Sequence, residues 1–305
     1  MSKAPYKKPV LTHAEQIDQL KSRGLIIEDE SKAIHLLSVI SYYRLSGYWY
    51  PLLENKKEHI FKEGASFETA FNLYKFDREL RLMIIGELEK IEVAIRSQLI
   101  YNLSHEHGAF WFLDSSLFTN PLKHATTLSK IGSELRRGDE EFIAEFYKNY
   151  NNAVPPSWMT MEVTSFGSQS FLFQNLKPGK VKRSIAKHFG LSDKVFESWL
   201  HSIVYLRNVC AHHSRLWNRD LRIRPVIPRK PRKQWLKHND IDNDKSYFVL
   251  SMILFFLNTI NPNHTFDKRF RELLEKYPNV DVFAMGFHEN WEEERLWNTL
   301  IEDEA

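Results

Sequence analysis

The stretch Phe196–His212, FESWLHSIVYLRNVCAH, predicts an amphipathic helix around which the rest of the fold is built. A helix turns by about 100° per residue, so apolar side chains that recur every three or four positions share one face. Ser192 and Asp193, just before the stretch, are residue types that favour a helix start. The apolar side chains fall in a band about 140° wide and comprise Val195, Phe196, Trp199, Leu200, Ile203, Leu206 and Cys210. Such a band must be buried against neighbouring helices.

Helical periodicity also dominates the remainder of the chain. The longest pattern covers residues 66–103, and a small hairpin is expected between Tyr48 and Phe61. The other predicted helices cover residues 12–20, 31–43, 123–136, 140–150, 158–174, 181–189, 247–260, 266–277 and 290–301. We therefore predict an all-α fold. Its expected parts are an N-terminal helical region with the hairpin (1–65), a helical domain (66–260) and short C-terminal helices packed on that domain (261–305).

The composition is that of a globular protein. The 305 residues are 43% hydrophobic and include 8 Trp, 12 Tyr and 21 Phe, enough for a large core. The lone Cys210 excludes an internal disulfide framework and a multi-cysteine zinc site, which fits a reducing cytoplasm. The longest apolar run, Tyr247–Leu257, is much shorter than the ~20 residues that cross a membrane as a helix. No secretory signal is recognised at the start. We expect a soluble cytoplasmic protein that does not enter a membrane.

Three polar side chains near the end of the Phe196–His212 helix carry the candidate chemistry: Arg207, Asn208 and His212. A fixed cation can bind a phosphate, and an imidazole can give or take a proton near neutral pH. These are groups that can cleave RNA without a metal. We expect no cofactor and no metal, because His212 and His213 point about 100° apart in a helix. Neither an H-E-x-x-H pattern nor a cysteine pair accompanies them.

The position of Arg207 leaves two roles open. Arg207 lies at the edge of the apolar band, where a guanidinium needs a partner. In one role it lines a groove and binds a phosphate. In the other it forms a structural ion pair with a carboxylate of the long helix, for which the candidates are Glu79, Glu87, Glu89 and Glu92.

The helix geometry also predicts a homodimer if the motif is catalytic. In an ideal helix, Arg207 and His212 diverge by about 140°, so one helix aims them poorly at a single phosphate. A second copy related by a two-fold axis would bring both side chains together. His201 and Tyr205 share a polar ribbon with Asn208 and His212. We predict that His201 and Tyr205 lie at the dimer seam.

A basic stretch directly follows the motif. Residues 215–237 contain nine Lys and Arg residues against one acid, Asp220. Pro225, Pro228 and Pro231 predict an extended loop here. The stretch is either a solvated basic loop or a surface for a polyanion, which cations at this density attract. Adjacency to the motif makes RNA the expected partner, and the predicted RNA-binding residues are Arg215, Arg219, Arg222, Arg224, Arg229, Lys230, Arg232 and Lys233.

The motif resembles a known family. Arg207-Asn-Val-Cys-Ala-His212 resembles the R-N-x-x-x-H motif of HEPN-domain ribonucleases, and His213-Ser-Arg-Leu-Trp-Asn-Arg219 is similar to bacterial abortive-infection proteins of the AbiD and AbiF type. Other segments agree with these proteins: Tyr42-Tyr-Arg-Leu-Ser-Gly-Tyr48, Phe76-Asp-Arg-Glu-Leu-Arg81, Pro156-Ser-Trp158, Ser165-Phe-Gly167, Met285-Gly-Phe287 and Trp291.

The resemblance implies a HEPN-like helical bundle, a homodimer and a metal-independent endoribonuclease that halts growth of a phage-infected cell. It also implies an antitoxin-like partner, either an RNA or a protein. In the expected mechanism, the RNA 2′-OH attacks the adjacent phosphate, with His212 as acid or base, Arg207 stabilising charge and Asn208 orienting the imidazole. Two alternatives remain open: an RNA-binding regulator that cuts nothing, and an enzyme that uses a nucleotide in the same groove.

Overall fold

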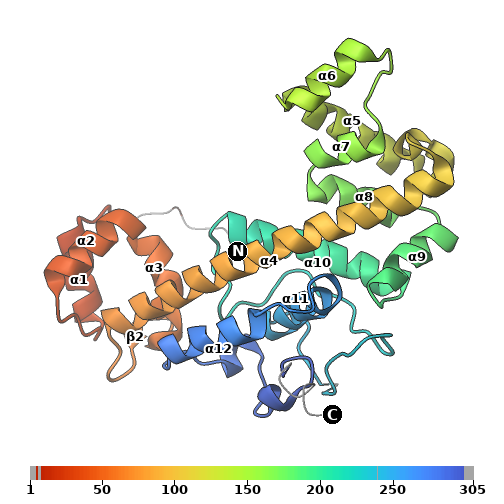
Figure 1. Ribbon diagram of the computed structural model, residues 1–305. Helices are drawn as coiled ribbons and strands as arrows, with labels where there is room; N and C mark the ends of the chain where they lie inside the picture. The colour runs from red at the N-terminus through yellow and green to blue at the C-terminus, as the bar shows by residue number, and fades with distance from the viewer. Residues whose placement is uncertain (1–4, 6–7, 239, 299–305) are drawn as a thin grey trace. The chain divides into compact units, whose positions relative to one another are not determined.

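Twelve α-helices supply nearly all of the regular structure in the described part of the chain, residues 5, 8–238 and 240–298 of a computed structural model (Figure 1). The predicted all-α class is confirmed. The chain divides into two compact units, residues 1–80 with 271–280 and residues 81–270 with 281–305. The three regions expected from the sequence (1–65, 66–260 and 261–305) have boundaries different from those of the two units, and that division stays a prediction.

Unit 1 holds three short helices and the hairpin. Its elements are α1 (His13–Ser22), α2 (Glu30–Ile40), α3 (Tyr42–Trp49), the strands β1 (Leu53–Asn55) and β2 (Ile60–Phe61), and the first turns of α4 (Phe67–His107). The two strands pair antiparallel, which confirms the predicted hairpin. Thr12 caps α1 in a reciprocal capping box with Glu15.

Two of the family-like segments meet inside unit 1. The Tyr48 hydroxyl of α3 donates to the Asp77 carboxylate of α4 at 2.6 Å, and both side chains are buried. Phe76, the neighbour of Asp77, packs its ring against Tyr277 with centroids 5.9 Å apart. A buried carboxylate needs such a donor, so these residues hold the unit together.

Three of the predicted helices differ from the structure. The predicted helix 31–43 ends at Ile40, because Ser41 takes a positive φ of 75° and its Oγ accepts from the Arg44 amide to start α3. The aromatic segment Tyr42–Trp49, which contains Gly47, is therefore helical. The predicted helix 158–174 is two helices, α7 (Ser157–Val163) and α8 (Phe166–Asn175), because Ser165 caps a new helix start. Residues 290–298 form only a 3₁₀ turn, η5 (Trp291–Glu293), and 299–301 lie outside the described residues.

Unit 2 is built around α10 (Asp193–Ala211), which packs against α8, α9 (Lys180–His188) and α11 (Ser246–Ile260) (Figure 1). Every member of the predicted apolar band is buried. Unit 2 also holds α4 from Arg81 onward, α5 (Pro121–Arg137), α6 (Glu141–Asn149), α7 and the start of α12 (Phe266–Lys276). The other 3₁₀ turns of the chain are η1 (Tyr50–Leu52), η2 (Trp111–Leu113), η3 (Ser115–Leu117) and η4 (Phe283–Met285). None of the described helices is long and apolar enough to cross a membrane.

The basic stretch Arg215–Lys237, which we call the basic strap, runs back along α10 without forming a helix or strand. The Arg222 amide donates to the Tyr205 hydroxyl at 3.3 Å, and the Val226 amide donates to Ser198 Oγ at 2.9 Å. Farther along, the Arg232 amide donates to the Gly190 carbonyl at 2.9 Å, next to the start of α10. These hydrogen bonds hold the strap along α10, and the strap runs antiparallel to the helix.

Gly190 fixes the far end of the strap. It ends α9 with a φ of +78°, its amide donates to Lys187, and the next amide donates to Ala186, a Schellman arrangement that favours glycine. A Cβ at this position would lie only 2.8 Å from Lys233 Cγ. Glycine is therefore required both for the backbone conformation and for the close approach of the strap.

Replacing Gly190 with Ala should lower the free energy of unfolding by about 1–2 kcal/mol, the typical cost of a left-handed non-glycine residue. Urea unfolding measures this change. Gly86→Ala is the matched control, because Gly86 lies inside α4 with no atom near its added Cβ. That variant should gain about 0.5–1 kcal/mol. Equal stability of Gly190→Ala and the parent protein would contradict the structural role of Gly190.

Candidate functional site

His212 lies at the C-cap of α10 and its side chain is exposed. The helix ends in a second Schellman arrangement, in which the His213 amide donates to Cys210 and the Ser214 amide to Val209. His213 takes the left-handed position with a φ of 56°, where glycine is usual. Among the described residues, the His212 ring has no hydrogen-bond or ion-pair partner. It is thus open to a ligand from outside the chain.

Arg207 points from α10 toward α4 and pairs with a carboxylate there. Its Nε lies 3.7 Å from Oε1 of Glu92, so one of the four predicted structural partners is present. The Arg207 side chain is still 47% exposed, whereas Glu92 is 13% exposed. Burial raises the pKa of Glu92, against the opposing effect of the Arg207 and Arg96 charges. The long, half-exposed pair is weak, so the guanidinium remains accessible to a second anion.

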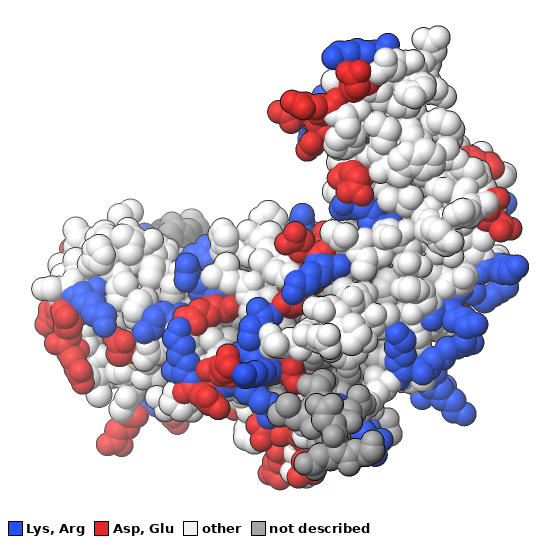
Figure 2. Space-filling view, viewed as in Figure 1, with Lys and Arg blue, Asp and Glu red and all other residues white. Residues whose placement is uncertain are grey.

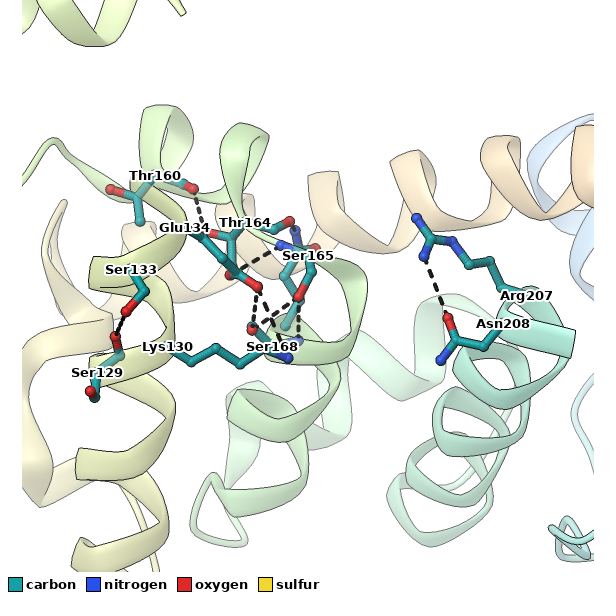
Figure 3. A network of polar contacts seen from close by, with 11 residues as sticks. Ser129, Lys130, Ser133, Glu134, Thr160, Thr164, Ser165, Ser168, Arg207 and Asn208 are labelled. Carbon is teal, nitrogen blue, oxygen red and sulfur yellow. Dashed lines mark hydrogen bonds and ion pairs between the residues drawn. The ribbon is translucent and has the colours of Figure 1, made fainter. Parts of the chain in front are cut away.

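Asn208 lies beside Arg207 on the exposed side of α10 (Figure 3). Its Oδ1 accepts from the Arg207 Nη1 at 3.4 Å. The backbone carbonyl of Asn208 also accepts from the His212 amide at 3.0 Å, so Asn208 contacts both ends of the motif. No described contact joins the side chains of Arg207 and His212 to each other.

The two residues predicted at the dimer seam differ in their surroundings. His201 is exposed and borders a shallow pocket of about 200 Å³ with Glu197 and Lys194. Tyr205 is half-buried, and its hydroxyl accepts a hydrogen bond from the Arg222 amide of the strap. His201 is therefore available to a second chain, whereas the Tyr205 hydroxyl already holds the strap in place.

Seven of the eight predicted RNA-binding residues separate into two groups, and the eighth, Arg215, is half-buried. Arg224 pairs with Asp244 at 2.5 Å, Lys233 donates to Thr259 Oγ1, and Arg219 donates to the Arg215 carbonyl. Four others are exposed and have no carboxylate partner among the described residues: Arg222, Arg229, Lys230 and Arg232. The second group supplies the accessible positive charge of the strap.

Two residues of the family-like segment His213–Arg219 have structural roles. Leu216 is fully buried, and its carbonyl accepts from Ser246 Oγ at 3.1 Å. The buried Trp217 donates its indole N–H to the Asp281 carbonyl at 3.4 Å. These two residues anchor the start of the strap in the core of unit 2.

A second polar network lies at the start of α8 (Figure 3). Glu134 of α5 accepts from the Ser165 amide and from Ser168 Oγ, both at 3.3 Å, and Lys130 stands 4.0 Å away. A carboxylate at a helix N-terminus is favoured by the exposed amides. Glu134 and Ser165 are 31 positions apart in the chain, so no local sequence pattern predicts their contact. The network positions Gly167 against Val204 of α10.

Within the described part of the chain, no group of three or more His, Cys, Asp and Glu side chains gathers as metal ligands would. The site therefore consists of an exposed imidazole, a half-exposed guanidinium, an amide between them and a cationic strap.

The raised pKa of Glu92 makes a prediction for stability. Since the folded state holds this proton more tightly than the unfolded state, stability falls as pH rises from the unfolded pKa through the folded pKa. Glu92→Gln carries no charge and escapes that loss. In urea unfolding, the difference in free energy of unfolding between Glu92→Gln and the parent protein should favour the variant more at pH 7.5 than at pH 4. An advantage that instead grows toward pH 4 would contradict the burial of a charged Glu92.

Comparisons with known proteins place these features in a family. The model of the Abi-like protein family matches residues 35–218, which is more than half of the chain and includes the whole of α10 and the motif. No curated protein and no solved structure matches the chain. The chain belongs to the Abi-like protein family.

Proposed function

We propose that this Abi-like protein is a metal-independent endoribonuclease of an abortive-infection system. Membership of the family supports the role in abortive infection. One structural observation carries the catalytic part: the exposed imidazole of His212 stands at the end of α10, where the cationic strap begins. RNA is the substrate class that uses both features, since its backbone binds cations and its 2′-OH is an internal nucleophile.

The chemistry follows from the groups present. The 2′-OH of one nucleotide attacks the adjacent phosphorus, and the bond to the 5′-oxygen breaks. The products are a 2′,3′-cyclic phosphate and a 5′-OH end. His212 takes the proton from the 2′-OH or gives one to the leaving oxygen. Arg207 stabilises the charge on the phosphorane oxygens, and Asn208 orients the groups on either side of it.

A site shared by two copies of the chain explains the geometry. Within one chain, Arg207 points to Glu92 on α4, whereas His212 follows the last turn of α10. A two-fold partner can place its His212 opposite Arg207 of the first chain. His201 then lies along the seam.

Cellular control belongs to the same proposal. An RNase with an exposed site would degrade RNA of its own host, so a partner must keep it silent until infection. We assign this role to an antitoxin-like RNA or protein that covers the motif or the strap.

A second reading uses the same surface without chemistry. The exposed cations of the strap would bind RNA whether or not His212 reacts, which favours an RNA-binding regulator as the alternative. Incubation of labelled RNA with the protein in EDTA separates the two, because a regulator leaves the RNA intact.

Replacing His212 with Ala should reduce cleavage by at least ~100-fold, since it removes the acid–base group. RNA binding should be preserved. The measurement is the rate of cleavage of a labelled RNA in EDTA, together with detection of the 2′,3′-cyclic phosphate. His35→Ala is the matched control, because His35 is an exposed histidine on α2. Undiminished cleavage by His212→Ala, or a requirement for Mg²⁺, would rule out the proposed mechanism.

Mixing two inactive variants tests the shared site. Arg207→Ala and His212→Ala should each be inactive alone, but a mixed dimer keeps one intact pair of Arg207 and His212. After co-refolding, about half of the dimers are mixed and one of their two sites works, so activity should return to about a quarter of the parent level. A mixture as inactive as its components would show that Arg207 and His212 do not act across two chains.

A further inference from the structure

A pocket of about 520 Å³ opens at the start of α10, the end opposite to His212. Its walls come from α9, from the turn between α9 and α10, and from the strap. Five cations line it, and they are Lys180, Arg183, Lys187, Lys230 and Arg232. The only acid in the lining is Asp193. Figure 2 shows Lys and Arg side chains gathered on this side, over α9 and the strap.

The three cations of α9 share one exposed face, because positions 180, 183 and 187 are three and four residues apart. None of the five lining cations has a carboxylate partner among the described residues. Lys182, on the buried face of the same helix, behaves differently: it donates to the carbonyls of Gln174 and Leu176 and pairs with Glu197. The fold thus satisfies the buried cation internally and leaves the outward cations for an external anion.

The surroundings of the pocket are electropositive. Lys233 lies over Gly190 at its edge, and the pKa of the nearby His188 is lowered, first by burial and then by the Lys233 charge. The N-terminus of α10, a helix of 19 residues, adds the positive end of its dipole. Like charges held this close repel one another, and a bound anion relieves that repulsion.

We propose that this pocket is a second phosphate-binding site, which holds the backbone of the same RNA several nucleotides away from the motif. The proposal rests on RNA as the substrate. The strap connects the two places, since its tie to Tyr205 lies near the motif and its tie to Gly190 lies at the pocket. The exposed Arg222 makes the tie to Tyr205, and the exposed Arg229 lies between the two ties. A continuous row of cations along a helix suits a linear polyanion.

The geometry also sets a length for the RNA. The 19 residues of α10 span about 28 Å at 1.5 Å per residue. With an axial rise of about 3.4 Å per nucleotide in a stacked strand, about eight nucleotides bridge the distance. RNA much shorter than this cannot occupy the motif and the pocket together.

The test uses full-length protein with His212→Ala, so that the RNA stays uncut, and measures binding of fluorescent oligouridylates by anisotropy. Affinity should rise steeply between 4 and 12 nucleotides. The triple variant Lys180→Ala, Arg183→Ala and Lys187→Ala should lose about tenfold for the 12-mer. Removal of three phosphate contacts should also reduce the slope of log affinity against log salt by about 2. Lys230→Ala with Arg232→Ala should weaken binding of the 12-mer from the other wall.

Two controls keep the outcome clear. Lys56→Ala, Lys57→Ala and Lys62→Ala remove the same charge from exposed positions of unit 1 and should change affinity less than twofold. The swap Lys180→Arg, Arg183→Lys and Lys187→Arg keeps the charge and should keep the affinity. The pocket is not an RNA site if the alanine triple binds the 12-mer as the parent does, if the unit 1 control loses as much, or if the swap also loses affinity.

Cleavage is measured separately, in protein with His212 intact. RNA that depends on the pocket for binding but is never cut would end the proposed ribonuclease function and leave the pocket in place. If the RNA is cut but the pocket variants bind it as tightly as the parent protein does, the ribonuclease function stands and the proposed phosphate site in the pocket fails.

Discussion

The buried indole of Trp199 holds together the parts of unit 2 on which the candidate site depends. Its ring is fully buried and meets Phe255 and Phe256 of α11 edge to face, with centroids 5.3 and 5.7 Å away. Its N–H donates to the Val226 carbonyl of the strap at 2.8 Å. A buried N–H without a partner costs about 1–3 kcal/mol, so the strap must approach α10 at this point. One side chain therefore fixes α11 on the apolar side of α10 and the cationic strap beside it.

The sequence predicted α10 well because two independent signals agree there. The apolar residues recur at helical spacing, and Ser192 caps the helix, its Oγ accepting from the Val195 amide. The breaks at Ser41 and Ser165 were missed because periodicity continues across them. A serine inside a helical pattern can either continue the helix or start another, and the positive φ of Ser41 is a conformation that its residue type does not predict. Element type was therefore predictable, but these boundaries were not.

The candidate site shows the same division. Arg207 was correctly placed at the edge of the apolar band, and Glu92 was one of four carboxylates named for it. Only tertiary packing selects Glu92, because the register between α4 and α10 decides which carboxylate comes within 3.7 Å. The cations of α9 were overlooked, although the pattern Lys180, Arg183, Lys187 was visible. Its meaning depends on the strap returning to Gly190, about 40 residues later in the chain, and no local pattern reports such a contact.

Net charge also conceals this surface. The chain carries only +3, a value that favours no particular partner. The fold instead pairs some of its cations with carboxylates and leaves others exposed to solvent. Lys182 and Arg224 are neutralised by Glu197 and Asp244, and Lys245 by Asp220, whose pKa the Lys245 hydrogen bond lowers. The outward cations of α9 and the strap residues Arg222, Arg229, Lys230 and Arg232 receive no such carboxylate among the described residues. Because the pairing occurs elsewhere, a nearly neutral chain can still present a strongly positive row along one helix, and the position of that row is set by the burial of α10.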